Sequence, residues 1–153
     1  MSDGVERFLE ALRVLGHEIE VRRFPEGTHT AQDAARAIGC DLAQIVKSLV
    51  FIADERAVLA LTSGMNRADA TKLRALTGAL SLRRANADEV RSATGYPIGG
   101  TPPFGGNLTT FIDEALTRFD VVWAGAGASD AVFGISPTDL IRLSGGTVAA
   151  FAE

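Results

Sequence analysis

A run of glycines and prolines at residues 95–105 contains the residue types most suited to contacting a ligand through the backbone. Between Gly99 and Pro103, four of the five residues are glycine or proline. Such a run cannot continue a helix or a paired strand, because proline has no N–H donor and glycine costs backbone entropy. It lies between apolar segments, so it predicts a rigid loop whose N–H and C=O groups can touch a small ligand. A tight structural turn explains the same residues equally well.

Lys47 is the cation with the most unusual position. It stands directly after Val46, at the entry to the strongly apolar run 49–52. A solvated lysine is more often found on the polar face of an amphipathic pattern. Its side chain therefore either extends to water along its methylene stem or lines a pocket where the ammonium meets an anion or a carbonyl group. We expect such a pocket to be shared with the loop at 99–103.

Other reactive side chains are few. Cys40 is the only cysteine, which excludes an intrachain disulfide and a cysteine-rich metal site. Its position after a predicted helix end favours a small buried residue over a nucleophile. His17 and His29 are the only histidines, too few to supply a zinc hydrolase well, and His29 is the better functional candidate. The run 125–127 lacks the third glycine of a dinucleotide-binding loop. We expect no metal and no cofactor.

The composition of the chain excludes several classes of protein. The apolar fraction is 46% and the net charge is −4. At 153 residues the chain is most simply one domain, over residues 1–153. No apolar run has the length of a membrane span, and we expect a cytoplasmic location. The negative charge argues against a protein that coats DNA or duplex RNA. It does not exclude an enzyme that binds only the end of an RNA. The arginine pairs at 22–23 and 83–84 are interpreted as solvated strand faces.

Apolar periodicity and turn residues predict interleaved helices and strands. Thr30, with an acidic residue three positions later, predicts a helix start, and Gly39 predicts its end. The strands 49–52 and 58–61 predict one hairpin, and 121–124 with 131–135 a second. Further helices are expected at 5–15, 69–76, 88–93, 114–118 and from 136, and further strands at 18–24, 79–82, 108–112 and 147–151. This order predicts an α+β fold with a mixed, curved sheet or partly closed barrel and helices packed outside.

Six segments together resemble one known family, the YbaK/prolyl-tRNA-synthetase-associated editing domains. The resemblance covers nearly the whole chain in the right order. The segments are 30–39 with 45–51, 67–73, 99–105, 124–133 and 136–140.

The resemblance implies a free-standing trans-editing enzyme that hydrolyses the ester of mischarged aminoacyl-tRNA. The expected substrate is tRNA(Pro) or a related tRNA carrying a small non-cognate amino acid. The expected partners are the tRNA acceptor end and, as a further candidate, an aminoacyl-tRNA synthetase. The residues that it implies for catalysis are Lys47, Gly99 and Gly100. Those that it implies for substrate binding are His29, Thr30, Thr101, Pro102, Pro103, Gly127, Ser129 and Asp130.

The chemistry of the reaction is compatible with the residues present. An aminoacyl ester is already activated, so positioned water and backbone N–H groups that stabilise the oxyanion suffice without a nucleophilic side chain. Two alternatives remain open at this point. One is a non-catalytic module that binds a tRNA end or a nucleotide, and the other is a protein whose loop captures a free amino acid.

Overall fold

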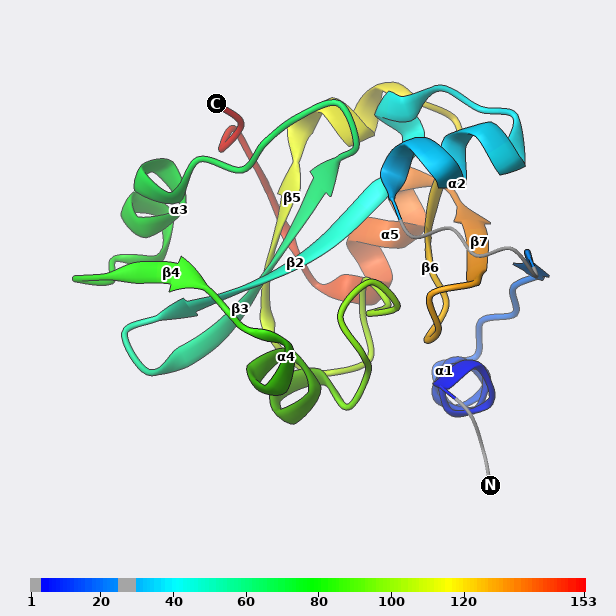
Figure 1. The fold of residues 1–153 in the computed structure, drawn as a ribbon, viewed down its shortest axis with the longest axis horizontal. Coiled ribbons are helices and arrows are strands. Elements are labelled where there is room, and N and C mark those ends of the chain that lie inside the picture. Colours follow the sequence, from blue (N-terminus) through cyan, green and yellow to red (C-terminus); the bar gives the residue numbers. More distant parts are fainter. Residues whose placement is uncertain (1–3, 25–29) are drawn as a thin grey trace.

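The structure is a computed structural model that describes residues 4–24 and 30–153. Helices and strands alternate irregularly along these residues (Figure 1). The helices are α1 (Gly4–Val14), α2 (Ala31–Ile38), α3 (Ala70–Thr77), α4 (Ala87–Thr94) and α5 (Pro137–Ser144), with 3-10 turns η1 (Leu42–Gln44) and η2 (Glu114–Arg118). The strands are β1 (Val21–Arg23), β2 (Val46–Ala53), β3 (Arg56–Ser63), β4 (Leu82–Arg84), β5 (Thr109–Asp113), β6 (Val122–Gly125), β7 (Ala131–Ile135) and β8 (Thr147–Ala149).

The strands form two sheets. The larger has the order β4-β2-β3-β5-β8, and the smaller has the order β1-β7-β6. The larger sheet is mixed, since β2 is antiparallel to both β3 and β4 whereas β5 is parallel to β3 and β8. The predicted α+β class and mixed sheet are confirmed. The strands are divided between two open sheets rather than joined in a single one, because the hairpin of β6 and β7 pairs with β1.

Alternating side chains of β2 enter two different apolar cores. Val46 and Val50 belong to the core that also contains α1 and residues of β6 and β7. Phe51 and Ala53 belong to the second core, which lies under α3. The larger sheet is therefore covered on both faces. Figure 1 shows the course of β2. Among the described helices, none combines the length and apolar character needed to cross a membrane.

Local sequence signals place most of the elements correctly. The Thr30 hydroxyl oxygen accepts the N–H of Asp33, and Gly39 ends α2 in the left-handed conformation at φ 84°, as predicted. The strand predicted at 79–82 is wrong, because β4 begins only at Leu82. The Asp54 carboxylate accepts the N–H groups of Leu80 and Ser81, and these bonds hold the preceding residues in a turn.

Candidate functional site

A pocket of about 350 Å³ lies along one edge of β2. Its walls come from α2, β2, β4, α4, the loop between α4 and β5, and the β6 and β7 hairpin. This volume is at the lower end of the range of small-molecule sites. The lining is largely apolar. Its charged and hydroxyl-bearing side chains are Thr30, Lys47, Ser48, Arg84 and Thr101.

The pocket exists because part of the β2 edge has no neighbouring strand. β4 pairs only with residues 51–53, and at the other end Ile45 forms an isolated bridge with Trp123 of β6. Residues 46–50 lie between these two points and line the pocket. The Val50 carbonyl accepts the N–H of Ala85, on the side away from β3. Backbone directions alternate along a strand, so the N–H and C=O of Ser48 also point to this open side.

Ser48 brings a second polar group to the same edge. Its hydroxyl oxygen is buried, yet it has no hydrogen-bond partner in the described structure. A buried hydroxyl without a partner is costly, and in a pocket it is available to a ligand or a water molecule. Ser48 is therefore a candidate for contact with a bound polar group.

Lys47 lines the pocket from the other face of the strand. Its side chain leaves β2 on the side of Leu49 and Phe51, opposite to Ser48. The ammonium group donates a hydrogen bond to the backbone carbonyl of Asn66. Burial is the main cause that lowers the pKa of Lys47, and the positive charges of Arg84 and Arg67 lower it further. Lys47 and the glycine loop both line this pocket, but they approach it from opposite faces of the sheet. A site in which the ammonium faces the loop therefore stays a prediction.

The loop at 97–101 contributes Ile98, Gly99 and Thr101 to the pocket. Gly99 has a φ of 84°, a conformation that explains why glycine stands there. The Thr101 hydroxyl donates to the carbonyl of Pro97 at 3.0 Å, which closes the loop on itself. The loop is therefore a tight structural turn that also forms part of the pocket wall, and contact of its backbone groups with a ligand stays a prediction.

Gly100 requires a correction. It is absent from the pocket lining, and both of its backbone groups are engaged. Its N–H donates to Pro97 at 3.0 Å, and its carbonyl accepts the N–H of Gly127 at 2.9 Å. A Cβ at Gly100 would lie 2.8 Å from the Ala128 backbone. Gly100 therefore joins two loops, and its N–H is not free to stabilise an oxyanion.

Several residues that the resemblance implied for substrate binding lie elsewhere. Pro102 lines a separate cavity of about 60 Å³ beside Tyr96 and Phe104, and Pro103 is buried. Gly127, Ser129 and Asp130 follow the last pocket residue of β6, but the described lining does not include them. Asp130 forms an ion pair with Arg23 at 3.1 Å. Only Thr30 and Thr101 of the predicted substrate-binding residues line the pocket, and His29 lies outside the described residues.

Arg84, Ser48 and Trp123 line the pocket but were not singled out as site residues. Ser48 directly follows Lys47, and Trp123 is the only tryptophan, so both carried a weak signal in the sequence. Arg84 was interpreted as part of a solvated strand face. It is exposed, but it also borders the pocket, because β4 ends where the open edge of β2 begins.

Neither a metal centre nor an activated thiol is formed by the described part of the chain. No group of three or more histidine, cysteine or acidic residues there could hold a metal ion. Burial, together with the negative charge of Asp41, raises the pKa of the Cys40 thiol. Cys40 packs beside α2 against the small apolar cluster of Ala34, Ala35 and Ile45. A thiol in this setting is a poor nucleophile at neutral pH.

The fold and the pocket together define an α+β domain with a small-ligand site formed by an open strand edge, a lysine and a glycine-rich loop. Comparison with known proteins shows its family. The aminoacyl-tRNA editing domain family matches residues 25–143, so the chain belongs to this family.

Individual relatives agree with this assignment. A solved structure of a candidate trans-editing enzyme for prolyl-tRNA synthetase superimposes with a TM-score of 0.93 and 42% identity, over 100% of this chain and 99% of that one. YwhH of Bacillus subtilis is 31% identical over 83% of this chain and 82% of its own length. Proline–tRNA ligase of Solidesulfovibrio magneticus is 34% identical over 69% of this chain. The match spans 18% of that ligase.

Proposed function

We propose that this protein is a free-standing aminoacyl-tRNA deacylase. It hydrolyses the ester between a tRNA and a small non-cognate amino acid, and the tRNA is tRNA(Pro) or a related one. Water attacks the ester carbonyl carbon, the bond to the ribose oxygen breaks, and a proton passes to that oxygen. The products are a free amino acid and an uncharged tRNA. The reaction takes place where translation occurs, so the proposal places the protein in the cytoplasm.

The observation that carries the proposal is the open edge of β2 between β4 and β6. Backbone N–H groups at such an edge are fixed donors, and donors of this kind stabilise an oxyanion without reorganising. The Ser48 N–H points to this side, and the Ser48 hydroxyl oxygen has no partner in the described structure. These two groups are suited to hold the ester carbonyl or the attacking water. A preactivated ester needs nothing more reactive.

Lys47 and the glycine loop have separate tasks in this proposal. The Lys47 ammonium stabilises negative charge at the ester or holds the terminal ribose. Gly99 and Thr101, with Ile98 beside them, form the wall that limits the size of the amino acid. A pocket of about 350 Å³ leaves room for a small side chain next to part of a ribose. The family assignment and the prolyl-tRNA synthetase relatives support tRNA(Pro) as the first substrate to test.

A panel of charged tRNAs tests the function. Purified protein is incubated with tRNA(Pro) carrying alanine, serine, cysteine or threonine, and prolyl-tRNA(Pro) is the control. We expect faster release of at least one non-cognate amino acid than in buffer, with prolyl-tRNA(Pro) spared. Binding of these tRNAs without release would favour the non-catalytic alternative.

A further inference from the structure

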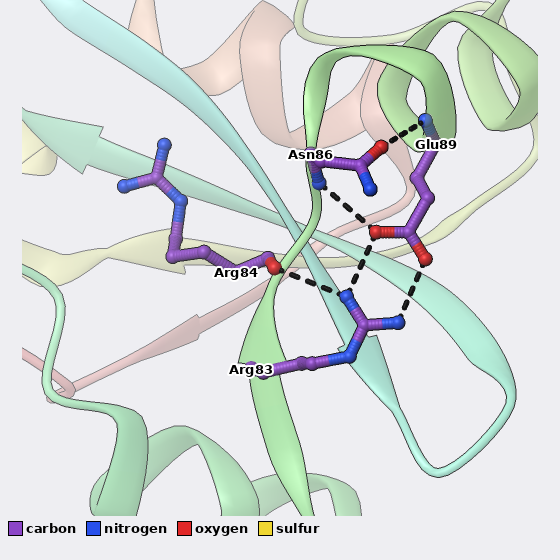
Figure 2. Close-up of polar contacts among 4 residues, drawn as sticks. All are labelled: Arg83, Arg84, Asn86 and Glu89. Atoms are coloured by element: carbon purple, nitrogen blue, oxygen red, sulfur yellow. Dashed lines mark hydrogen bonds and ion pairs between the residues drawn. The ribbon is translucent and has the colours of Figure 1, made fainter.

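Arg83 and Arg84 are neighbours in β4, but they have different surroundings (Figure 2). The Arg83 guanidinium donates to both carboxylate oxygens of Glu89, at 2.8 and 2.7 Å. The Glu89 carboxylate also accepts the N–H of Asn86 at 3.0 Å, as part of the cap of α4. These bonds lower the pKa of Glu89 to about 2. The Arg83 side chain therefore links β4 to the start of α4.

Arg84 points away from this cluster (Figure 2). Among the described residues it forms no ion pair with a carboxylate. Its guanidinium lies over the Phe51 ring, 5.6 Å from the centroid, which is within the limit of about 6 Å for a cation–π contact. Stacking of this kind orients the planar group without neutralising its charge. Arg84 also lines the pocket, at the end where β4 leaves the edge of β2.

A second cation, Lys47, lies close enough to interact with Arg84, although the chain has a net charge of −4. Arg84 is paired with Phe51 across the strands, so its side chain is on the face of the sheet from which Lys47 also extends. Lys47 is partly buried and bound to the Asn66 carbonyl, whereas Arg84 is exposed at the rim. Two cations on one side of a pocket attract an anion, and the outer one meets it first.

We propose that Arg84 binds a phosphodiester of the RNA that carries the ester, next to the terminal nucleoside. This inference rests on the proposed function and assigns the phosphate contact to Arg84 rather than to Lys47. A guanidinium forms two parallel hydrogen bonds with phosphate oxygens, and a fixed orientation favours this geometry. Lys47 is then left to act on the ester or the ribose inside the pocket.

The test compares substrates with and without a phosphate. Arg84→Gln is measured beside the matched control Arg83→Gln, on mischarged tRNA and on the same amino acid esterified to adenosine. We expect Arg84→Gln to lower kcat/KM on tRNA about tenfold, the effect of one charged hydrogen-bonding group. The adenosine ester lacks phosphate, so its hydrolysis should not change. Arg83→Gln should treat both substrates alike.

Three results would overturn the proposal. They are equal losses for Arg84→Gln on both substrates, equal effects of the two variants on tRNA, and no effect of Arg84→Gln on either substrate. If the wild-type protein hydrolyses neither substrate, the proposed function fails, and binding of the trinucleotide CpCpA decides the present inference separately. Arg84→Gln should then weaken CpCpA binding and reduce its salt dependence, whereas Arg83→Gln should not. Absence of wild-type binding to CpCpA would also count against the proposal.

Discussion

Lys47 donates its ammonium hydrogen bond to the backbone carbonyl of Asn66, and the side-chain amide of Asn66 donates to Asp113 at 2.9 Å. Asp113 is 1% exposed, and it also accepts the N–H groups of Ser63 and Ala115. The residue that positions Lys47 is thus fixed to a buried carboxylate at the end of β5. This arrangement holds the lysine in place at the pocket, and no carboxylate of residues 4–24 or 30–153 forms an ion pair with it.

The pKa of Lys47 should respond to Arg84. Burial lowers this pKa most, and the repulsion from Arg84 lowers it further, so Arg84→Gln should raise it toward 10.5. The measurement is an NMR titration of the lysine side-chain carbons in both proteins. An unchanged pKa would show that the two charges do not interact.

The same shift has a consequence for stability. The folded protein holds the Lys47 proton less tightly than the unfolded chain, so the unfolded chain binds more protons between the lowered pKa and 10.5. The contribution of Lys47 therefore disfavours folding below that window and is relieved as pH rises through it. The Arg84→Gln variant should gain less stability from this relief than the wild-type protein, which denaturant titrations of both proteins at several alkaline pH values can measure.

Substitution of glycine in the loop should separate structural from spatial effects. Gly100→Ala should lower the free energy of unfolding by about 2 kcal/mol, because its Cβ would overlap the Ala128 backbone. Gly99→Ala should cost about 1 kcal/mol from the left-handed backbone alone. Gly106→Ala, with no atom within 4 Å of the added Cβ and no such backbone constraint, is the control. Urea unfolding of the three variants measures the order, and equal stability of Gly100→Ala and Gly106→Ala would contradict the contact between the loops.

Replacement of the only thiol should leave hydrolysis intact. Cys40 does not line the pocket, and burial keeps its thiol protonated at neutral pH. Cys40→Ala should therefore retain wild-type deacylation, with a small loss of stability from the cluster beside α2. The rates of the two proteins on one mischarged tRNA measure this. Loss of activity in Cys40→Ala at wild-type stability would require a covalent thioester route instead.

Binding to RNA should depend only weakly on salt. Lys47 and Arg84 are the cations of the pocket, so the slope of log affinity against log salt should lie between about −1 and −3. Fluorescence anisotropy of a labelled acceptor-stem RNA, measured from about 50 to about 200 mM salt, gives this value. A steeper slope, or equally tight binding of an unrelated RNA duplex, would show a basic surface outside the pocket.

The sequence predicted features that depend on neighbouring residues in the chain. The Thr30 cap, the Gly39 helix end and the hairpin of β2 and β3 follow from local signals, and the structure has all three. Contacts between distant segments could not be predicted in this way. The bond between Gly100 and Gly127 and the ion pair of Arg23 with Asp130 depend on how the loops meet. Because of these two contacts, the predicted site residues Gly100 and Asp130 are engaged outside the pocket lining.

The different surroundings of Arg83 and Arg84 also depend on contacts between segments that are distant in the sequence. Side chains of adjacent strand residues point to opposite faces of the sheet. The sequence alone does not show which of the two arginines borders the pocket. The register of β4 with β2 decides this, and the strand was predicted two or three residues too early. An error in register of that size is enough to hide a pocket residue.

The most direct test of the proposed deacylase is a single-turnover rate on the best mischarged tRNA, with Lys47→Ala compared with Lys72→Ala. Lys72 is an exposed lysine that donates to the Ala152 carbonyl, away from the pocket. The account predicts that Lys47→Ala lowers the rate about 100-fold, the usual cost of one group that stabilises the transition state. Lys72→Ala should match the wild-type rate, and both variants should stay folded. A wild-type rate no faster than buffer, or a Lys47→Ala rate equal to wild type, would contradict the account.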